Sequence, residues 1–310
     1  MTNVCVTIDT EGDIASYKFS TFLGMSVIVP KLLELFSKYN IKATFFIQED
    51  EICQISSLFS ELCNSLEDYG HEIGFHAHGL ERATVEKKEC IITDGIQRLR
   101  KFGVEPVSFR AGRYHFDGSV LKILEKNRIK YDSSVVPGLR ECFSDGTVKC
   151  DHLGAPYQPY YPAYENHCKQ GSSKVLELPI NRYPNLLHHN CSGILAGGQG
   201  NEEVLFDYFY EIRKDQLIII NLHPWHGLSV VAYRFARTEK YGMLRKYALG
   251  SIAKLVSSGF LINRSYITRL DNLFRHISEK NNIAYTTIRA AGESIELQTK
   301  NELSRRDGNL

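Results

Sequence analysis

Short apolar runs alternate with amphipathic helical stretches along most of the chain. Residues 4–9 (VCVTID) are apolar and β-branched and end at a polar turn, which predicts a buried strand followed by a loop. Residues 27–39 then show helical spacing, with Val29, Leu32 and Phe36 on one side. The chain therefore opens with a β-strand and an α-helix.

The same alternation continues through the first half of the sequence. It predicts strands over residues 43–47, 71–77, 107–111 and 129–135, and helices over residues 55–69, 84–102 and 118–127. Strands that alternate with helices favour a parallel sheet with right-handed crossovers, and many consecutive units favour a closed barrel. The pattern thus predicts an α/β fold of the barrel type.

The alternation stops between residues 137 and 201. This stretch holds six of the nine prolines, the tyrosine-rich run YQPYYPAY and one plausible strand, residues 175–180. We expect a long loop insertion over one face of the barrel, and long insertions in compact domains are usually functional. The tyrosines fit a carbohydrate-facing loop and an extended proline-rich cover equally well.

The βα pattern returns after the insertion. It predicts a helix over residues 202–214, a very apolar strand over 217–222, a helix over 240–257, a last strand near 260–263 and an amphipathic helix over 269–280. There is no internal repeat and no linker. We expect one barrel domain over residues 1–282 and a polar C-terminal tail over residues 283–310.

Composition narrows the classes of partner. Thirty-seven basic against thirty-six acidic residues leave the net charge near zero, so no general attraction to nucleic acid or to an anionic membrane is expected. No apolar window approaches the roughly 20 residues of a membrane span. The start, MTNVCVTID, lacks the pattern of an export signal. We therefore expect a cytoplasmic protein whose eight cysteines are reduced thiols.

Two histidines stand at the end of one predicted strand, in the run GHEIGFHAHG. Side chains alternate across a strand with period two, so His76 and His78 share one face and can reach one metal ion. Imidazole is the commonest protein ligand for zinc-like cations, and an open site adds a carboxylate or water. His71 lies on the opposite side of the strand and is expected to be structural.

Other strands deliver ionisable groups to the same edge. Active sites of parallel barrels lie at the carboxyl ends of the strands. The residues at or near those ends are Asp9, Glu11, Arg110, Asp132 and His223. With the strand of His76 and His78, five strands each bring such a group to one rim, which is hard to attribute to solvation alone.

The series TIDTEGD, GHEIGFHAH, FRAGR, YDSS and LHPWH resembles, in this order, the motif set of the polysaccharide deacetylase family (NodB homology, carbohydrate esterase family 4). The resemblance runs from about residue 4 to residue 226. It implies a distorted (β/α) barrel with about seven parallel strands, and one divalent metal ion, most often zinc, with cobalt or nickel as alternatives. It also implies hydrolysis of N-acetyl groups on amino sugars.

The resemblance implies a role for each site residue. Asp9 would be the general base, and Arg110 would pair with it and keep it ionised. Glu11, His76 and His78 would bind the metal. His223 would be the general acid that protonates the leaving amine, with Asp132 as the residue that orients it.

Three motifs depart from the family pattern. Thr10 separates Asp9 from Glu11 where the family has adjacent aspartates, so either carboxylate could be the ligand. The family's second histidine lies at the position of Leu80, so His78 serves instead. The arginine motif continues into Gly112 and Arg113 rather than into proline.

The expected function is metal-dependent deacetylation of a carbohydrate, a nucleotide-linked or lipid-linked amino sugar or a short glycan, in surface-polysaccharide (O-antigen or capsule) assembly. One rival is a deformylase or cyclic-amide hydrolase on the same scaffold, since fold and metal do not dictate the substrate. A second is an inactive barrel that only binds carbohydrate or protein. The sequence leaves the oligomeric state open, and Trp225 fits either sugar stacking or a core position.

Overall fold

The computed structural model describes residues 1–12, 24–48, 56–182, 202–228 and 262–307. Seven parallel strands follow one another in the order β9-β1-β2-β3-β4-β5-β8, and an eighth, β10, pairs in parallel with the start of β1. Their bounds are β1 Thr2–Thr10, β2 Thr44–Ile47, β3 Glu72–Ala77, β4 Ser108–Ala111, β5 Tyr131–Asp132, β8 Leu176–Glu177, β9 Leu217–Leu222 and β10 Ile283–Thr286. The predicted distorted barrel is confirmed.

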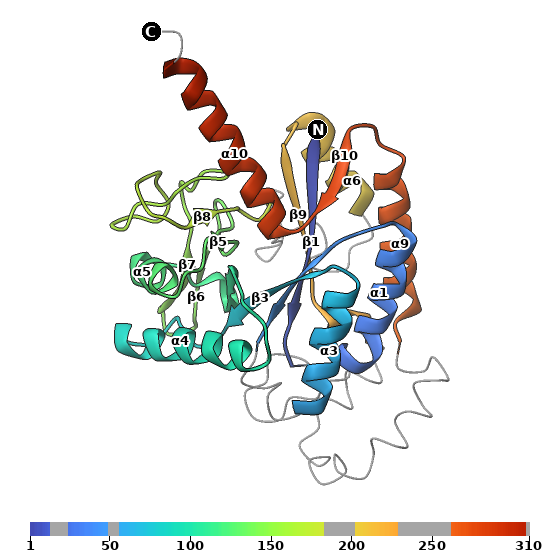
Figure 1. The fold of residues 1–310 in the computed structure, drawn as a ribbon, viewed down its shortest axis with the longest axis horizontal. Helices are drawn as coiled ribbons and strands as arrows, with labels where there is room; N and C mark the ends of the chain where they lie inside the picture. The colour runs from blue at the N-terminus through green and yellow to red at the C-terminus, as the bar shows by residue number, and fades with distance from the viewer. Residues whose placement is uncertain (13–23, 49–55, 183–201, 229–261, 308–310) are drawn as a thin grey trace.

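Helices cover the outside of this curved sheet (Figure 1). They are α1 Val29–Lys38, α3 Ser56–Asp68, α4 Val85–Lys101, α5 Gly118–Lys126, α6 Glu202–Asp207, α9 Arg264–Ser278 and α10 Ile288–Asp307. In the view of Figure 1, α4 and α5 lie to the left of the central strands and α1, α3 and α9 to the right. None of the described helices combines the length and apolar composition that a bilayer-spanning segment needs.

The apolar spacing that predicted each helix is the spacing that buries it. In α1 the buried side chains are Val29, Leu32, Leu35 and Phe36, and in α9 they include Leu270, Leu273, Phe274 and Ile277. The rings of Phe36 and Phe274 meet edge to face at 5.9 Å, which joins the two helices. The predicted helix over residues 240–257 lies outside the described residues.

His71 has a structural place, as expected. Its Nδ1 accepts a hydrogen bond from the Ala43 backbone N–H at 3.0 Å, just before β2. Its ring packs edge to face on Phe36 and Phe45, and burial lowers its pKa to about 4. It is therefore a neutral acceptor and lies away from the carboxyl ends of the strands.

The insertion after residue 137 is more ordered than a loop. It contains an antiparallel hairpin, β6 Arg140–Cys142 and β7 Val148–Asp151, before the chain rejoins the sheet at β8. Its tyrosines do not share one face. Tyr160 is buried and donates to the His167 carbonyl at 2.6 Å, whereas Tyr157 is half exposed.

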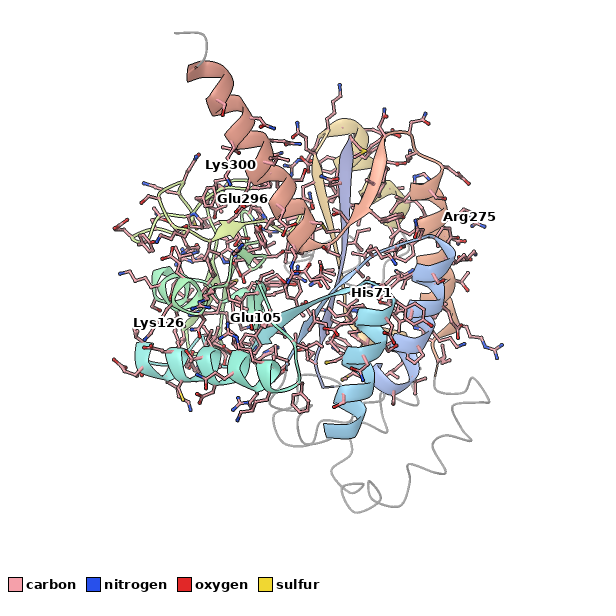
Figure 2. The ribbon with its side chains drawn as sticks, viewed as in Figure 1. His71, Glu105, Lys126, Arg275, Glu296 and Lys300 are labelled. Atoms are coloured by element: carbon pink, nitrogen blue, oxygen red, sulfur yellow. The ribbon has the colours of Figure 1, made fainter. Side chains whose placement is uncertain are left out.

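The expectation of a polar C-terminal tail is wrong for residues 283–307. Strand β10 joins the sheet, and α10 begins directly after it. The first turn of α10 is held by β2 and β3, because Thr44 Oγ1 accepts from the Ile288 N–H and Glu72 Oε2 accepts from the Arg289 N–H, both at 2.9 Å. Figure 2 shows Glu296 and Lys300 further along α10, where the helix leaves the body of the molecule.

Candidate metal and active site

Strand β1 places two carboxylates at its carboxyl end. Residues 9 and 11 are two apart, so Asp9 and Glu11 project from the same side of the strand while Thr10 points to the other. Both carboxylates are buried, with 2% and 4% of their surface exposed. A buried carboxylate needs a cationic or hydrogen-bonding partner, and the two acids have different ones.

Strand β3 supplies two imidazoles in the same way. The rings of His76 and His78 are nearly perpendicular, and their Nε2 atoms are 3.1 Å apart. His76 Nδ1 lies 2.9 Å from the Arg110 carbonyl oxygen, which can only accept a hydrogen bond. The proton of the neutral ring is therefore on Nδ1, and the Nε2 lone pair is free to bind a cation.

Glu11 completes a set of three ligand atoms. Its Oε2 lies 2.6 Å from His78 Nε2 and 3.7 Å from His76 Nε2. Zinc holds such ligands at about 2.0–2.2 Å, so ligand atoms around a tetrahedral ion lie about 3.4 Å from one another. The observed spacings and the donor set fit one divalent cation. Among the described residues this is the one group of three or more His, Cys, Asp or Glu with metal-ligand spacing.

Glu11 stays ionised in this setting. Burial alone would raise the pKa of its carboxyl, but the neighbouring imidazoles of His76 and His78 outweigh burial and hold the pKa well below its usual range. Trp225 Nε1 donates to the second oxygen, Oε1, at 3.4 Å. The tryptophan thus orients the carboxylate from the loop after β9.

Gly112 gives His78 its position. A Cβ on Gly112 would come within 2.5 Å of the His78 ring, so only glycine allows the imidazole to lie against this backbone. Two departures from the family motifs therefore belong together: the histidine two residues after His76, and the glycine that follows Ala111.

Asp9 faces Arg110 rather than the histidines. Its Oδ1 accepts from Arg110 Nη1 at 2.8 Å, and its Oδ2 accepts from Asn221 Nδ2 at 3.1 Å. Burial pushes the pKa of Asp9 up, but the Arg110 guanidinium outweighs it and keeps the pKa below its usual value. The geometry favours Glu11 as the carboxylate ligand and leaves Asp9 beside the ligand set.

The residue that sequence reasoning missed is Asn221. It lies at the end of β9, where its side chain accepts from Arg110 Nη1 at 2.9 Å and donates to Asp9. Thr7 on β1 also accepts from Arg110, at 2.8 Å. The available signal was a single amide inside the otherwise apolar run LIIINL.

His223 lies on the cavity side of both carboxylates. Its Nε2 is 3.5 Å from Asp9 Oδ2 and 3.7 Å from Glu11 Oε1. The side chain is 21% exposed, against 4–5% for the two carboxylates, so it is the more accessible group. Trp225 and His226 pack around it, with ring centroids 5.2 Å away.

Asp132 does not meet His223, contrary to expectation. It is fully buried between β4 and β8, where it accepts from Ser134 Oγ at 2.7 Å and lies beside Glu177 in the sheet register. The acidic groups that do approach His223 are Asp9 and Glu11. Asp132 therefore organises the loop after β5.

A cavity of about 530 Å³ opens over the ligand set. One side of it is formed by the carboxyl ends of β1, β3 and β9, and the other by the turn after β4 and by the β6–β7 hairpin. The lining residues from this second side are Arg113, Tyr114, Leu139, Glu141, Phe143 and Lys149. The insertion that interrupts the βα pattern thus forms a wall of the site.

Comparison with known proteins agrees with this architecture. Residues 21–131 match the family model for polysaccharide deacetylase. Over 132 residues the chain is 29% identical to a peptidoglycan deacetylase of Helicobacter pylori; the match covers 41% of this chain and 42% of that protein. The chain thus spans less than half of this relative's length.

Solved structures share the fold over nearly the whole chain. A protein from Mycobacterium smegmatis assigned as a polysaccharide deacetylase has a TM-score of 0.60 and 17% identity, with 96% of this chain and 91% of that chain covered. An allantoinase has a TM-score of 0.59 and 11% identity, with 94% and 89% covered. At these identities the similarity shows the fold.

The fold and the site define a parallel (β/α) barrel protein whose strand ends gather a carboxylate and two histidines beneath a cavity. The family-model match over residues 21–131 and the shared fold make the chain similar to polysaccharide deacetylases of the NodB-homology, carbohydrate esterase family 4 type.

Proposed function

We propose that the protein is a metal-dependent hydrolase that removes the N-acetyl group of an amino sugar during surface-polysaccharide assembly. The observation that carries the proposal is the convergence of Glu11, His76 and His78 at ligand spacing, with Asp9 and His223 beside them under one cavity. The polysaccharide deacetylase match and a relative named as a peptidoglycan deacetylase support the substrate class.

The ligand set would hold one divalent cation, zinc being the first candidate with cobalt or nickel as alternatives. Such a cation supplies a Lewis acid that polarises the amide carbonyl and lowers the pKa of water to about 7. The remaining steps belong to side chains of this chain.

Asp9 is the proposed general base. Its Oδ2 takes the proton of the attacking water, while Arg110 and Asn221 hold the carboxylate in place. His223 is the proposed general acid, whose Nε2 protonates the nitrogen of the leaving amino sugar. The products are the free amine and acetate, and no covalent intermediate with the protein is required.

The test is release of acetate from N-acetylated sugars by protein loaded in turn with zinc, cobalt or nickel. Asp9→Asn should lower turnover at least 100-fold, since a positioned base contributes about 10²- to 10⁴-fold. Asp271→Asn, which changes a partly exposed carboxylate on α9 paired with Lys38, is the matched control and should keep full activity. Absence of turnover on every amide by metal-loaded protein would reject the proposal.

The same assay separates the rivals. Formate or a ring-opened product in place of acetate would indicate a deformylase or a cyclic-amide hydrolase. Carbohydrate binding that survives both Asp9→Asn and metal removal, without turnover, would indicate a binding barrel. A cytoplasmic location stays a prediction that cell fractionation would test.

A further inference from the structure

The β6–β7 hairpin presents one face to the cavity. Glu141 on β6, Phe143 directly after β6 and Lys149 on β7 all line the cavity. These residues lie opposite the catalytic groups of β1 and β9. A substrate whose amide reaches Asp9 and His223 therefore has the hairpin on its other side.

The ring of Phe143 is surrounded by cations. The guanidinium carbon of Arg82 is 4.3 Å from the ring centroid, Lys149 Nζ is 5.2 Å and the guanidinium carbon of Arg113 is 5.4 Å. Cation–π contacts of this length are attractive. They fix the ring at the rim of the cavity and gather positive charge around it.

Lys149 is the cation with hydrogen-bonding capacity to spare. Arg82 pairs with Asp145 at 2.6 Å and Arg113 pairs with Glu81 at 3.0 Å. The ion pair of Lys149 with Glu141 is 3.7 Å long, too long for a hydrogen bond. Within the described part of the chain, the Lys149 ammonium makes no hydrogen bond, although its side chain is only 27% exposed.

The residues next to this cluster have a strained backbone that their surroundings maintain. Arg113 and Tyr114 both have positive φ, 52° and 58°, a left-handed conformation that is costly for residues with a Cβ. His115 next to them donates from Nδ1 to the Lys149 carbonyl at 2.8 Å. The strained turn after β4 is thus hydrogen-bonded to β7, the strand of Lys149, and the two form one wall of the cavity.

We propose that Lys149, Arg113 and Phe143 form a subsite for an acidic group, a phosphate or a carboxylate, carried by the substrate beside its N-acetylated sugar. Lys149 and Arg113 bind the anion, and the Phe143 ring holds their charged groups at the cavity. The proposal rests on the proposed function for the identity of the sugar. The anion subsite itself does not depend on turnover.

Binding is tested first with probes that a deacetylase cannot hydrolyse, glucose 1-phosphate against glucose. The metal-loaded wild type should bind glucose 1-phosphate about tenfold more tightly in titration calorimetry, and added salt should weaken this preference. Lys149→Met, which keeps the apolar stem, should abolish most of it. Lys169→Ala, an exposed lysine elsewhere in the insertion, should leave it unchanged.

Turnover then distinguishes the source of the anion. N-acetylglucosamine 1-phosphate, N-acetylmuramic acid with its lactyl carboxylate, and neutral N-acetylglucosamine are compared by acetate release. One anionic substrate should have about tenfold higher kcat/KM than the neutral sugar, through KM, and Lys149→Met should remove the difference. The favoured substrate shows whether phosphate or carboxylate is recognised.

Glu141→Gln provides an independent readout, because it removes the carboxylate that competes for Lys149. It should raise the affinity for glucose 1-phosphate several-fold. Equal binding of both probes by the wild type, or an unchanged preference in Lys149→Met, overturns the subsite. Loss of all turnover with the binding preference intact would reject the proposed function and keep the subsite.

Discussion

Arg110 is a fully buried guanidinium whose hydrogen bonds reach three other parts of the barrel. Its partners are Thr7 and Asp9 on β1, Asn221 on β9, and the Ser133 hydroxyl and carbonyl after β5, at distances between 2.8 and 2.9 Å. Its planar group also lies over the Phe46 ring at 4.4 Å. A single side chain therefore fixes the relative positions of the strands that carry the proposed catalytic groups.

Replacing Arg110 by methionine should lower the free energy of unfolding by about 3–5 kcal/mol, because the buried Asp9 carboxylate loses its partner. Urea denaturation measures the change. Arg82→Met is the control: its ion pair with Asp145 is more than half exposed, so its loss should cost less than about 1 kcal/mol. Equal losses of unfolding free energy in the two variants would contradict the argument that burial makes the Arg110–Asp9 ion pair important.

Gly112→Ala should weaken metal binding because the new methyl group displaces the His78 ring. We expect a drop of about 10- to 100-fold in metal affinity, the range seen when a supporting contact of a ligand is lost. Competition with a chelating indicator measures it. In a double-mutant cycle, Gly112→Ala should add little to His78→Ala. Additive effects would mean that the glycine acts elsewhere.

Some of the individual site residues could be predicted from the sequence. His76 and His78 followed from strand periodicity, and the carboxylates from their place at a strand end. Asn221 and Gly112 did not, because each acts on a side chain that is distant in sequence. Asp132 was misplaced because its partner, Glu177, lies 45 positions further along the chain and meets it only through strand pairing.

The pairing of strand β5 with strand β8 brings two buried carboxyl groups together, Asp132 and Glu177. Burial and the neighbouring Asp132 carboxylate raise the pKa of Glu177 well above its usual 4.5. A raised carboxyl pKa means that the folded state binds the proton more tightly. Its contribution to stability is full below pH 4.5 and is lost as the pH rises through the folded-state pKa.

Glu177→Gln should therefore flatten the fall in stability as the pH is raised from about 5 to 8, since the amide stays neutral in both states. Urea denaturation at a series of pH values measures this. Glu203→Gln, at a partly exposed position on α6, is the control and should leave the slope unchanged. A wild type whose stability does not fall over this interval would contradict the raised pKa of Glu177.

Helix α10 docks through its first turns only. Ile288 and Ala291 are fully buried, and Gly292 lies against the Tyr131 ring, whereas Leu297 is 60% exposed. Ile288→Ala should cost about 2–4 kcal/mol of unfolding free energy because it opens a cavity. Leu297→Ala, on the same helix, should cost less than about 0.5 kcal/mol. Equal costs in chemical denaturation would contradict this one-ended docking.

The βα units were predictable because each has a local apolar period. The exception is the C-terminal segment, where few apolar positions contact the barrel and the first turn is capped by Thr44 and Glu72 from distant strands. No local pattern carries such information. Likewise, the hairpin in the insertion is fixed by contacts with the turn after β4, such as that between His115 and Lys149.

For the whole molecule, the barrel is not closed by a continuous ladder. Among the described strands, β8 pairs only with β5, and β9 only with β1. This leaves a seam between β8 and β9, where the two strands do not pair. The side chain of Asn181, which follows β8, spans this seam. Its Oδ1 accepts from the Ile219 N–H at 2.6 Å, and its Nδ2 lies 3.0 Å from Asp215 Oδ2 and 3.4 Å from the Leu217 carbonyl.

Asn181→Ala should therefore loosen the contact between β8 and β9. The position of β9 depends on this contact, and Asn221 and His223 lie at the end of β9. The substitution leaves the buried Ile219 N–H without a partner, which costs about 1–3 kcal/mol. Amide hydrogen exchange should accelerate in β9 but not in β3, since local opening begins where pairing is weakest. Asn281→Ala, at an exposed position before β10, should change neither quantity. Uniform acceleration in both strands would mean that Asn181 supports overall stability rather than the seam.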